Sequence, residues 1–245
     1  MNLRYIHLGL DYDAYSSVNN ELRYEFQQKT NFISDYFSKA IRKYKLETDG
    51  TFNMISIIPT EFELKALSIN PIEVLGVYLP FDKSRYEEIQ GTEDCGYYLE
   101  LLEQGFRKAT EFKPIPLDTF LYLIEEFKNG GCKNEWLHKR KRFKEHDLEV
   151  FLTCEFTTNY FQLIVTINRI STKKELVKGI IIRTETGISI HQGLYKDIII
   201  DKDIIITDRS DSPRIIIDKE KIFTGILDFE IQGDNEIKEI LSYGL

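Results

Sequence analysis

The apolar residues of this chain change their spacing near residue 130, and this change limits the possible fold more than any other feature. Before that point they recur every three or four residues in segments 18–46, 92–109 and 118–127, which is typical of amphipathic helices. After it, short runs alternate apolar with polar residues, which is typical of strands. We therefore predict an α+β protein, with N-terminal helices packed on a small sheet and a C-terminal half that is mainly antiparallel β.

Turn-forming residues divide the N-terminal half into its elements. Ser16 or Ser17 is available to cap the first long helix, and Ser84 begins a Ser-x-x-Glu capping box. Asp118 can cap the last of these helices. Glycine and proline residues bound two β-rich runs, which we expect to pair in one sheet covered by the first helix. The predicted strands of this half are 4–10, 52–58 and 72–79.

Short polar joints separate the extended runs of the C-terminal half, as expected of an antiparallel meander. Gly130 and Gly131 can end the preceding helix, so we place a boundary there. The prediction is two domains, 1–131 and 132–245, or alternatively one continuous domain. The predicted strands are 135–144, 148–156, 160–170, 177–185, 188–191, 197–200, 204–207, 214–217 and 222–231, followed by a helical turn within 236–245.

Isoleucine triplets are concentrated in the C-terminal half. Segment 196–208 contains Lys-Asp-Ile twice at a spacing of six residues, and a third triplet follows at 215–217. Parallel β-helices have such a period, but they need at least about three repeats, and the spacing is not kept at the third triplet. Strand propensity alone accounts for the triplets, so we assign them to the fold rather than to a function.

A hairpin explains the first two triplets. With residues 201–203 as the turn, Ile200 lies opposite Ile204 and Ile198 lies opposite Ile206. The central isoleucine of each triplet then faces the other side of the sheet. We therefore expect a pair of strands that is covered on both faces.

The composition indicates a soluble globular protein of the cytoplasm. The formal net charge of −8 disfavours broad binding to phosphate backbones or anionic membranes and permits a basic protein partner. Cys95, Cys132 and Cys154 are odd in number and widely spaced, so we expect reduced thiols. The N-terminal residues lack the pattern of a signal peptide, and no apolar run is long enough to span a bilayer. We expect no association with membranes.

A basic segment follows the predicted boundary and offers one functional hypothesis. Lys139, Arg140, Lys141, Arg142 and Lys144 form a cluster that can bind nucleic acid. On a strand, however, the arginines face one side and the first two lysines face the other, which divides the charge. A solvated or salt-bridged strand is the simpler interpretation, and we keep nucleic-acid binding as an alternative.

Catalytic motifs are missing from the sequence, which favours a protein that is not an enzyme. It contains no nucleophile elbow, phosphate-binding loop or dinucleotide fingerprint, and we predict neither a cofactor nor a metal site. The enzyme alternative is a small-molecule transferase or hydrolase whose site combines distant residues such as Cys132, His138 and His146. Cys154 lies in an apolar run and is expected to be a small core residue.

An acidic and aromatic cluster precedes the first long helix. Asp11, Tyr12, Asp13 and Tyr15 combine carboxylates with tyrosines, which suits the recognition of a basic protein. The plain alternative is a loop leading into the helix. Our hypothesis is a non-catalytic cytosolic protein-binding module, of which an immunity-type inhibitor of a basic toxin or nuclease is the specific form.

Overall fold

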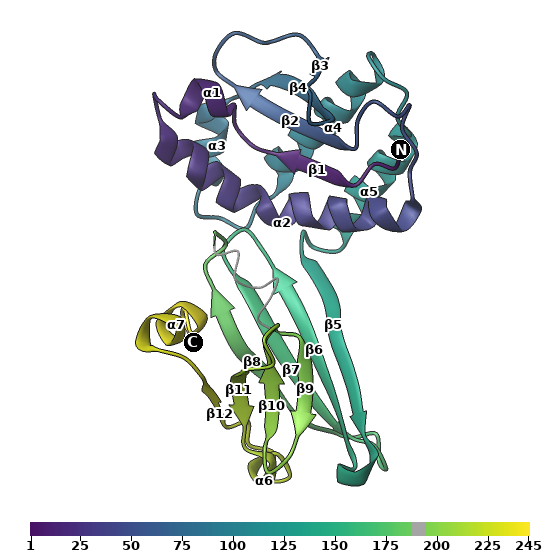
Figure 1. Ribbon diagram of the computed structural model, residues 1–245. Coiled ribbons are helices and arrows are strands. Elements are labelled where there is room, and N and C mark those ends of the chain that lie inside the picture. The colour runs from purple at the N-terminus through teal and green to yellow at the C-terminus, as the bar shows by residue number, and fades with distance from the viewer. Residues whose placement is uncertain (188–194) are drawn as a thin grey trace. The chain divides into compact units, whose positions relative to one another are not determined.

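The computed structural model describes residues 1–187 and 195–245 and confirms the α+β class (Figure 1). The chain separates into two compact units: an N-terminal unit of Met1–Asn134 with Thr157–Asn159, and a C-terminal unit of Glu135–Phe156 with Tyr160–Leu245. The division into domains 1–131 and 132–245 stays a prediction, and the predicted strand 188–191 lies outside the described residues. Within the described part, no helix is long and apolar enough to cross a membrane.

The N-terminal unit contains a four-stranded sheet in the order β1-β2-β4-β3. The first three strands are parallel, and β3, which was not predicted, pairs antiparallel with β4. Alternate residues such as Ile6, Ile55, Ile57 and Val77 are completely or almost completely buried on one face, because the strand period of two directs them to the same side. The strands are β1 (Tyr5–Leu8), β2 (Met54–Thr60), β3 (Ser68–Ile69) and β4 (Val74–Pro80).

The helices of this unit begin at other residues than predicted. Asn19, and neither Ser16 nor Ser17, caps the long helix, because a short helix occupies the preceding residues and the Asn19 side chain accepts from the Leu22 N–H at 3.1 Å. Asp82, and not Ser84, is the N-cap of the next helix. Asp118 lies inside the first turn of its helix, where the helix dipole stabilises a carboxylate. The helices are α1 (Tyr12–Tyr15), α2 (Asn20–Tyr44), α3 (Lys83–Ile89), α4 (Gly96–Thr110) and α5 (Leu117–Asn129).

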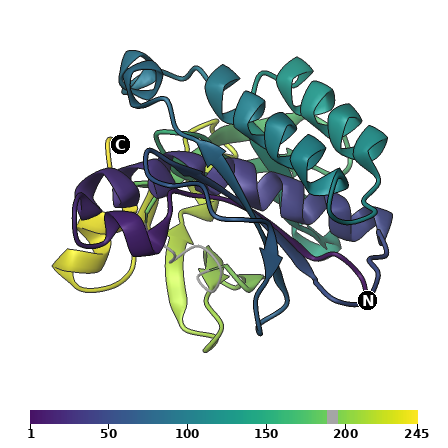
Figure 2. The same cartoon turned by 90° about the horizontal axis from the view of Figure 1, so that it is seen from above.

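Aromatic side chains fill the space between these helices and the sheet. The rings of Phe106 on α4 and Phe120 on α5 stack with centroids 4.2 Å apart, and Phe37 on α2 lies 6.2 Å from Phe106. Figure 2 shows α4 and α5 side by side, in agreement with this stacking. Gly105 allows α4 to approach the sheet, because a Cβ atom there would lie 2.5 Å from Cγ1 of Ile57.

A disulfide joins Cys95, which precedes α4, to Cys132, which follows α5. The expectation of reduced thiols is therefore wrong for these two residues. The reason is the packing of α4 against α5, which brings together positions that are 37 residues apart in sequence. Cys154 is buried in the C-terminal unit, as expected of a small core residue.

The C-terminal unit begins with the predicted meander, a sheet in the order β5-β6-β7-β8. The pairs β6 with β7 and β7 with β8 are antiparallel. A short 3-10 helix, η1 (Lys144–His146), connects β5 to β6. The strands are β5 (Asn134–Phe143), β6 (Leu148–Phe156), β7 (Phe161–Arg169) and β8 (Glu175–Thr184).

The isoleucine triplets form a second antiparallel sheet, in the order β12-β11-β10-β9. Ile200 pairs with Ile204 and Ile198 with Ile206, which confirms the predicted hairpin. The expected cover on both faces is wrong for this unit, because Ile199 is 42% exposed whereas Ile198 is fully buried. The strands are β9 (Asp197–Ile200), β10 (Ile204–Thr207), β11 (Pro213–Ile217) and β12 (Phe229–Ile231).

The predicted strand 222–231 is mostly wrong, since only its last three residues form β12. Asp218 caps a short helix, α6 (Lys219–Ile222), by accepting from the Lys221 N–H at 3.0 Å. Gly225 follows with a φ of 83°, and this left-handed conformation interrupts the extended run. The predicted terminal turn is the helix α7 (Asn235–Leu241).

Candidate functional site

The four residues predicted to bind a partner lie at the carboxyl end of β1. Because β1 and β2 are parallel, the segments that follow them leave the sheet at the same edge. The backbone N–H of Asp11 donates to the Pro59 carbonyl oxygen at 3.4 Å, which fixes the first segment against the second. Residues 11–15 and 61–65 therefore form one cluster.

Asp11 organises this cluster from a buried position. It is only 4% exposed, and its side chain caps α1 by accepting from the Asp13 N–H at 3.1 Å. The ammonium of Lys65 lies 3.1 Å from the Asp11 carboxylate and 3.3 Å from that of Asp13. The hydrogen bond to Asp11 raises the pKa of Lys65 despite its partial desolvation. Lys65 is therefore a fixed cation at neutral pH, without the free amine that a base or nucleophile needs.

Tyr15 is buried, and its hydroxyl is fully engaged. The hydroxyl donates to Oε2 of Glu61 at 3.1 Å and accepts from the Glu61 N–H at 3.1 Å. Its ring packs edge-on against Phe62, with centroids 5.2 Å apart. Burial is the main reason that the pKa of Tyr15 is raised. Tyr15 thus anchors the loop after β2.

Tyr12 and Asp13 remain at the surface, and two residues of α2 extend this part of the cluster. The guanidinium of Arg23 lies 4.9 Å from the centre of the Tyr12 ring and 4.7 Å from that of Tyr24. Tyr12 is 65% exposed and Tyr24 is 56% exposed. We call Tyr12, Asp13, Arg23 and Tyr24 the tyrosine face.

Sequence reasoning missed the contribution of α2 to this face. Arg23 and Tyr24 lie next to the core residue Leu22 in the first turns of the helix, outside its apolar stripe. The signal in the sequence was Tyr24, an aromatic residue on the polar face of an amphipathic helix. The contact with Tyr12, however, depends on the angle at which α1 meets α2, which no local pattern specifies.

Ion pairs divide the basic strand β5 as its alternation predicts. Lys139 and Lys141 both contact Asp197, at 3.2 and 2.9 Å. Arg140 and Arg142 instead share Glu149, at 2.8 and 3.4 Å. The fifth residue of the predicted cluster, Lys144, belongs to η1. The structure thus places the first four cations in two separate groups, and each group contains one carboxylate.

Each residue of the enzyme alternative has its own local contacts. Cys132 is in the disulfide, Nε2 of His138 lies 2.5 Å from the Tyr195 carbonyl oxygen, and His146 belongs to η1. Over residues 1–187 and 195–245, no group of three or more His, Cys, Asp or Glu side chains could hold a metal ion. Burial lowers the pKa of His7, whose Nδ1 lies 3.0 Å from Oγ of Ser56, so this histidine is neutral at neutral pH.

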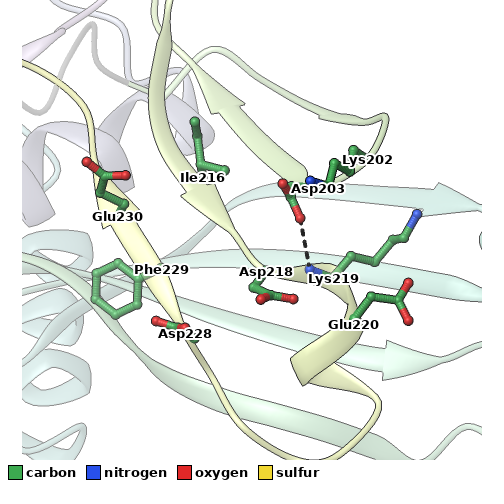
Figure 3. Close-up of a pocket in the computed structure, with 9 residues that line it drawn as sticks. All are labelled: Lys202, Asp203, Ile216, Asp218, Lys219, Glu220, Asp228, Phe229 and Glu230. Atoms are coloured by element: carbon green, nitrogen blue, oxygen red, sulfur yellow. Dashed lines mark hydrogen bonds between the residues drawn. The ribbon is translucent and has the colours of Figure 1, made fainter.

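An open hollow of about 590 Å³ lies at the β11, β12 and α6 end of the second sheet (Figure 3). Local contacts occupy several of its charged groups: the Lys219 N–H donates to Asp203 at 3.5 Å, and Lys221 pairs with Asp228. We call it the acidic hollow, because carboxylates outnumber cations in its lining. The lining residues are Lys202, Asp203, Ile216, Asp218, Lys219, Glu220, Asp228, Phe229 and Glu230.

Comparisons of the chain with protein-family models, curated proteins and solved structures find no match. These comparisons therefore supply no role for any of these residues. Function has to be inferred from the tyrosine face and from the charged groups of the two units.

Proposed function

We propose that this chain is a non-catalytic protein-binding module that recognises its partner through the tyrosine face. The observation that carries the proposal is the Arg23 guanidinium stacked on two exposed tyrosine rings. Tyrosine and arginine are enriched among the residues that dominate binding energy at protein interfaces. The stack also orders the three side chains before binding, which reduces the entropy that they lose in a complex.

Charge supports a basic partner. The sequence of Met1–Asn134 contains 21 Asp and Glu residues against 15 Lys and Arg. Within the cluster of residues 11–15 and 61–65, four carboxylates, those of Asp11, Asp13, Glu61 and Glu63, stand against the single cation of Lys65, so the cluster is negatively charged. Such a field accelerates the approach of a positively charged protein. The specific form of the proposal is an immunity-type inhibitor that neutralises a basic toxin or nuclease in the cytosol.

The protonation states at the cluster suit binding better than catalysis. The raised pKa values of Lys65 and Tyr15 keep the amine charged and the phenol protonated at neutral pH. A general base or nucleophile would need the opposite shift. The groups therefore hold the loop and display charge, which is what a recognition surface requires.

The nucleic-acid alternative has weaker support. The basic residues of β5 that face Asp197 and those that bond Glu149 are already paired within the chain. A single-strand platform would combine exposed aromatic rings with one continuous basic groove. The two separate groups of cations do not form such a groove.

The test is affinity capture of the full chain from its own cells, followed by native mass spectrometry at low and moderate salt. The Tyr12→Ala/Tyr24→Ala variant removes both rings of the stack, and the Tyr44→Ala/Tyr122→Ala variant removes two exposed tyrosines elsewhere in the same unit. We expect one stoichiometric basic protein with the wild type and the control. The tyrosine-face variant should retain at least about tenfold less of it. Equal capture by both variants would contradict the proposal, as would a stoichiometric metabolite in place of a protein.

A further inference from the structure

A second hollow, of about 290 Å³, lies on the first sheet of the C-terminal unit. It is formed by β5, β6, the end of β7 and the turn between β7 and β8. Glu149 on β6 pairs directly with Asn168 on β7, so their side chains share one face of the sheet. We call it the basic hollow. Its polar lining residues are Arg140, Arg142, Glu149, Asn168, Arg169 and Lys173.

Positive charge exceeds negative charge in this lining. Four cationic residues and one carboxylate, Glu149, line the hollow, and Glu149 pairs with Arg140 and Arg142. Two more carboxylates lie close by: Asp147 accepts from the N–H and the hydroxyl of Ser171, and the exposed Glu175 pairs with Asn168 across the sheet. Neither of these two carboxylates lines the hollow. Bringing several cations together is unfavourable unless an anion compensates them.

A buried polar atom of the lining residues, Oδ1 of Asn168, has no hydrogen-bond partner within the described part of the chain and lies on the same face of the sheet as Glu149. Such groups are rare in folded proteins, and a bound ligand or ion is one of their regular explanations. Oδ1 of Asn168 is an acceptor and suits a hydroxyl. The next residue, Arg169, pairs with the fully buried Leu148 on the opposite face, and its guanidinium lies 5.3 Å from the centre of the Phe223 ring.

We propose that the basic hollow binds a small phosphate-bearing ligand that also carries a hydroxyl group. Guanidinium groups bind phosphate through paired N–H donors, and Arg140 and Arg142 still have donors beyond those that reach Glu149. Arg140 is held in place by the Phe151 ring, 5.2 Å from its guanidinium carbon. The volume fits a phosphomonoester of a few carbon atoms rather than a polymer. This site is independent of the tyrosine face.

Glycerol 3-phosphate is a suitable probe, because it combines a phosphate with two hydroxyl groups. We would titrate it into the full chain by isothermal calorimetry and by ¹H–¹⁵N NMR at constant ionic strength, with glycerol and inorganic sulfate as comparison ligands. The variants are Arg140→Gln and Arg142→Gln. The control is Lys141→Gln, which removes a cation of the same strand that pairs with Asp197 outside the hollow. Thermal unfolding without ligand identifies any variant that fails to fold.

The proposal predicts saturable binding of glycerol 3-phosphate, with NMR shifts concentrated at residues 140–142, 149 and 168–173. Arg140→Gln and Arg142→Gln should each weaken binding by about tenfold or more, and Lys141→Gln by less than about twofold. Binding of sulfate as tight as that of glycerol 3-phosphate would contradict the hydroxyl part of the proposal. The proposal as a whole would be overturned by the absence of saturable binding or by equal losses in all three variants.

Discussion

Each unit of the chain contains a triplet of charges in which one central charge lies between two of the opposite sign, and the signs are reversed between the two units. In the N-terminal unit, one ammonium, that of Lys65, lies between the carboxylates of Asp11 and Asp13. In the C-terminal unit, one carboxylate, that of Asp197, lies between the ammonium groups of Lys139 and Lys141. In each triplet the central charge neutralises one of its two neighbours, so one charge remains: a negative charge in the first unit and a positive charge in the second. The other face of β5 repeats the second pattern, because Arg140 and Arg142 share Glu149 at the basic hollow. We propose that these local surpluses, and not the net charge of the chain, decide which partner each surface favours.

The cores of the two units also differ, and the largest predicted effect tests that difference. The N-terminal core depends on rings such as Phe106, which is fully buried and stacked on Phe120. We expect Phe106→Ala to lower the free energy of unfolding by about 3–5 kcal/mol, because it leaves a cavity between α4 and α5. Phe112→Ala, at an exposed ring of the same unit, should cost less than about 0.5 kcal/mol. If chemical denaturation showed equal losses of unfolding free energy for the two variants, the buried rings would not be what stabilises this unit.

Removing the central charge of each triplet tests the comparison itself. Lys65→Gln leaves the buried carboxylate of Asp11 without its cation, and we expect a loss of about 1–2 kcal/mol after allowance for the exposure of Lys65. Asp197→Asn should cost less than about 1 kcal/mol, because Lys139 and Lys141 are more accessible to water than Asp11. Urea denaturation of both variants measures the difference. The reverse order would show that burial of Asp11 does not set the strength of the first triplet.

The two tyrosines of α1 should separate structure from recognition. Tyr15→Phe removes the hydroxyl that bonds Glu61, so we expect a loss of about 1 kcal/mol in stability. Tyr12→Phe keeps the ring over Arg23 and should change stability by less than about 0.5 kcal/mol. Thermal unfolding of the two variants under identical conditions makes the comparison. A larger effect at Tyr12 would mean that the exposed stack stabilises the fold rather than serving a partner.

The smallest predicted effect is a difference in pH dependence. Burial tends to raise the pKa of Asp197, but hydrogen bonds from Lys141, the Ile198 N–H and Lys139 outweigh it and lower the value to about 2. A lowered pKa stabilises the fold above the unfolded value of 3.8, and this contribution is lost as the pH falls towards 2. Asp197→Asn should therefore flatten the stability curve between pH 4 and 2.

The Lys65 triplet should respond at the other end of the pH scale. Its raised pKa gives a contribution that is complete below the unfolded value of 10.5 and lost only as the pH rises beyond it. When stability is measured from pH 2 to 11, the deficit of Asp197→Asn relative to the wild type should therefore shrink as the pH falls from 4 to 2, and that of Lys65→Gln should shrink only above about pH 10.5. Identical curves for the two variants would contradict the assignment of these carboxylates and amines to separate triplets.

Local sequence patterns correctly predicted the strands whose bounds depend on neighbouring residues alone. The strands Leu148–Phe156, Asp197–Ile200 and Ile204–Thr207 have the predicted bounds, because period-two alternation between polar joints is a local property. The disulfide was missed because Cys95 and Cys132 meet only when α4 packs against α5. Strand 222–231 failed for a different reason: its apolar residues suit a strand, but Asp218 caps a helix turn there.

The candidate site was predicted in part. Asp11, Tyr12, Asp13 and Tyr15 do form part of one cluster, but the sequence did not separate the two buried residues from the two exposed ones. Exposure depends on which side of α1 faces the loop after β2, and this is a tertiary property. The partners Lys65 and Arg23 come from other elements for the same reason.

The most direct test of the opposite surpluses is a pair of NMR titrations on one ¹⁵N-labelled sample of the full chain at constant ionic strength. One titration adds a lysine-rich decapeptide, and the other adds glycerol 3-phosphate. We expect the peptide to shift the resonances of Tyr12, Asp13, Arg23 and Tyr24, and the phosphate to shift those of Arg140, Arg142 and Asn168. Shifts of the same residues by both probes would contradict the opposite surpluses, as would a peptide that shifts the acidic hollow and leaves the tyrosine face unchanged.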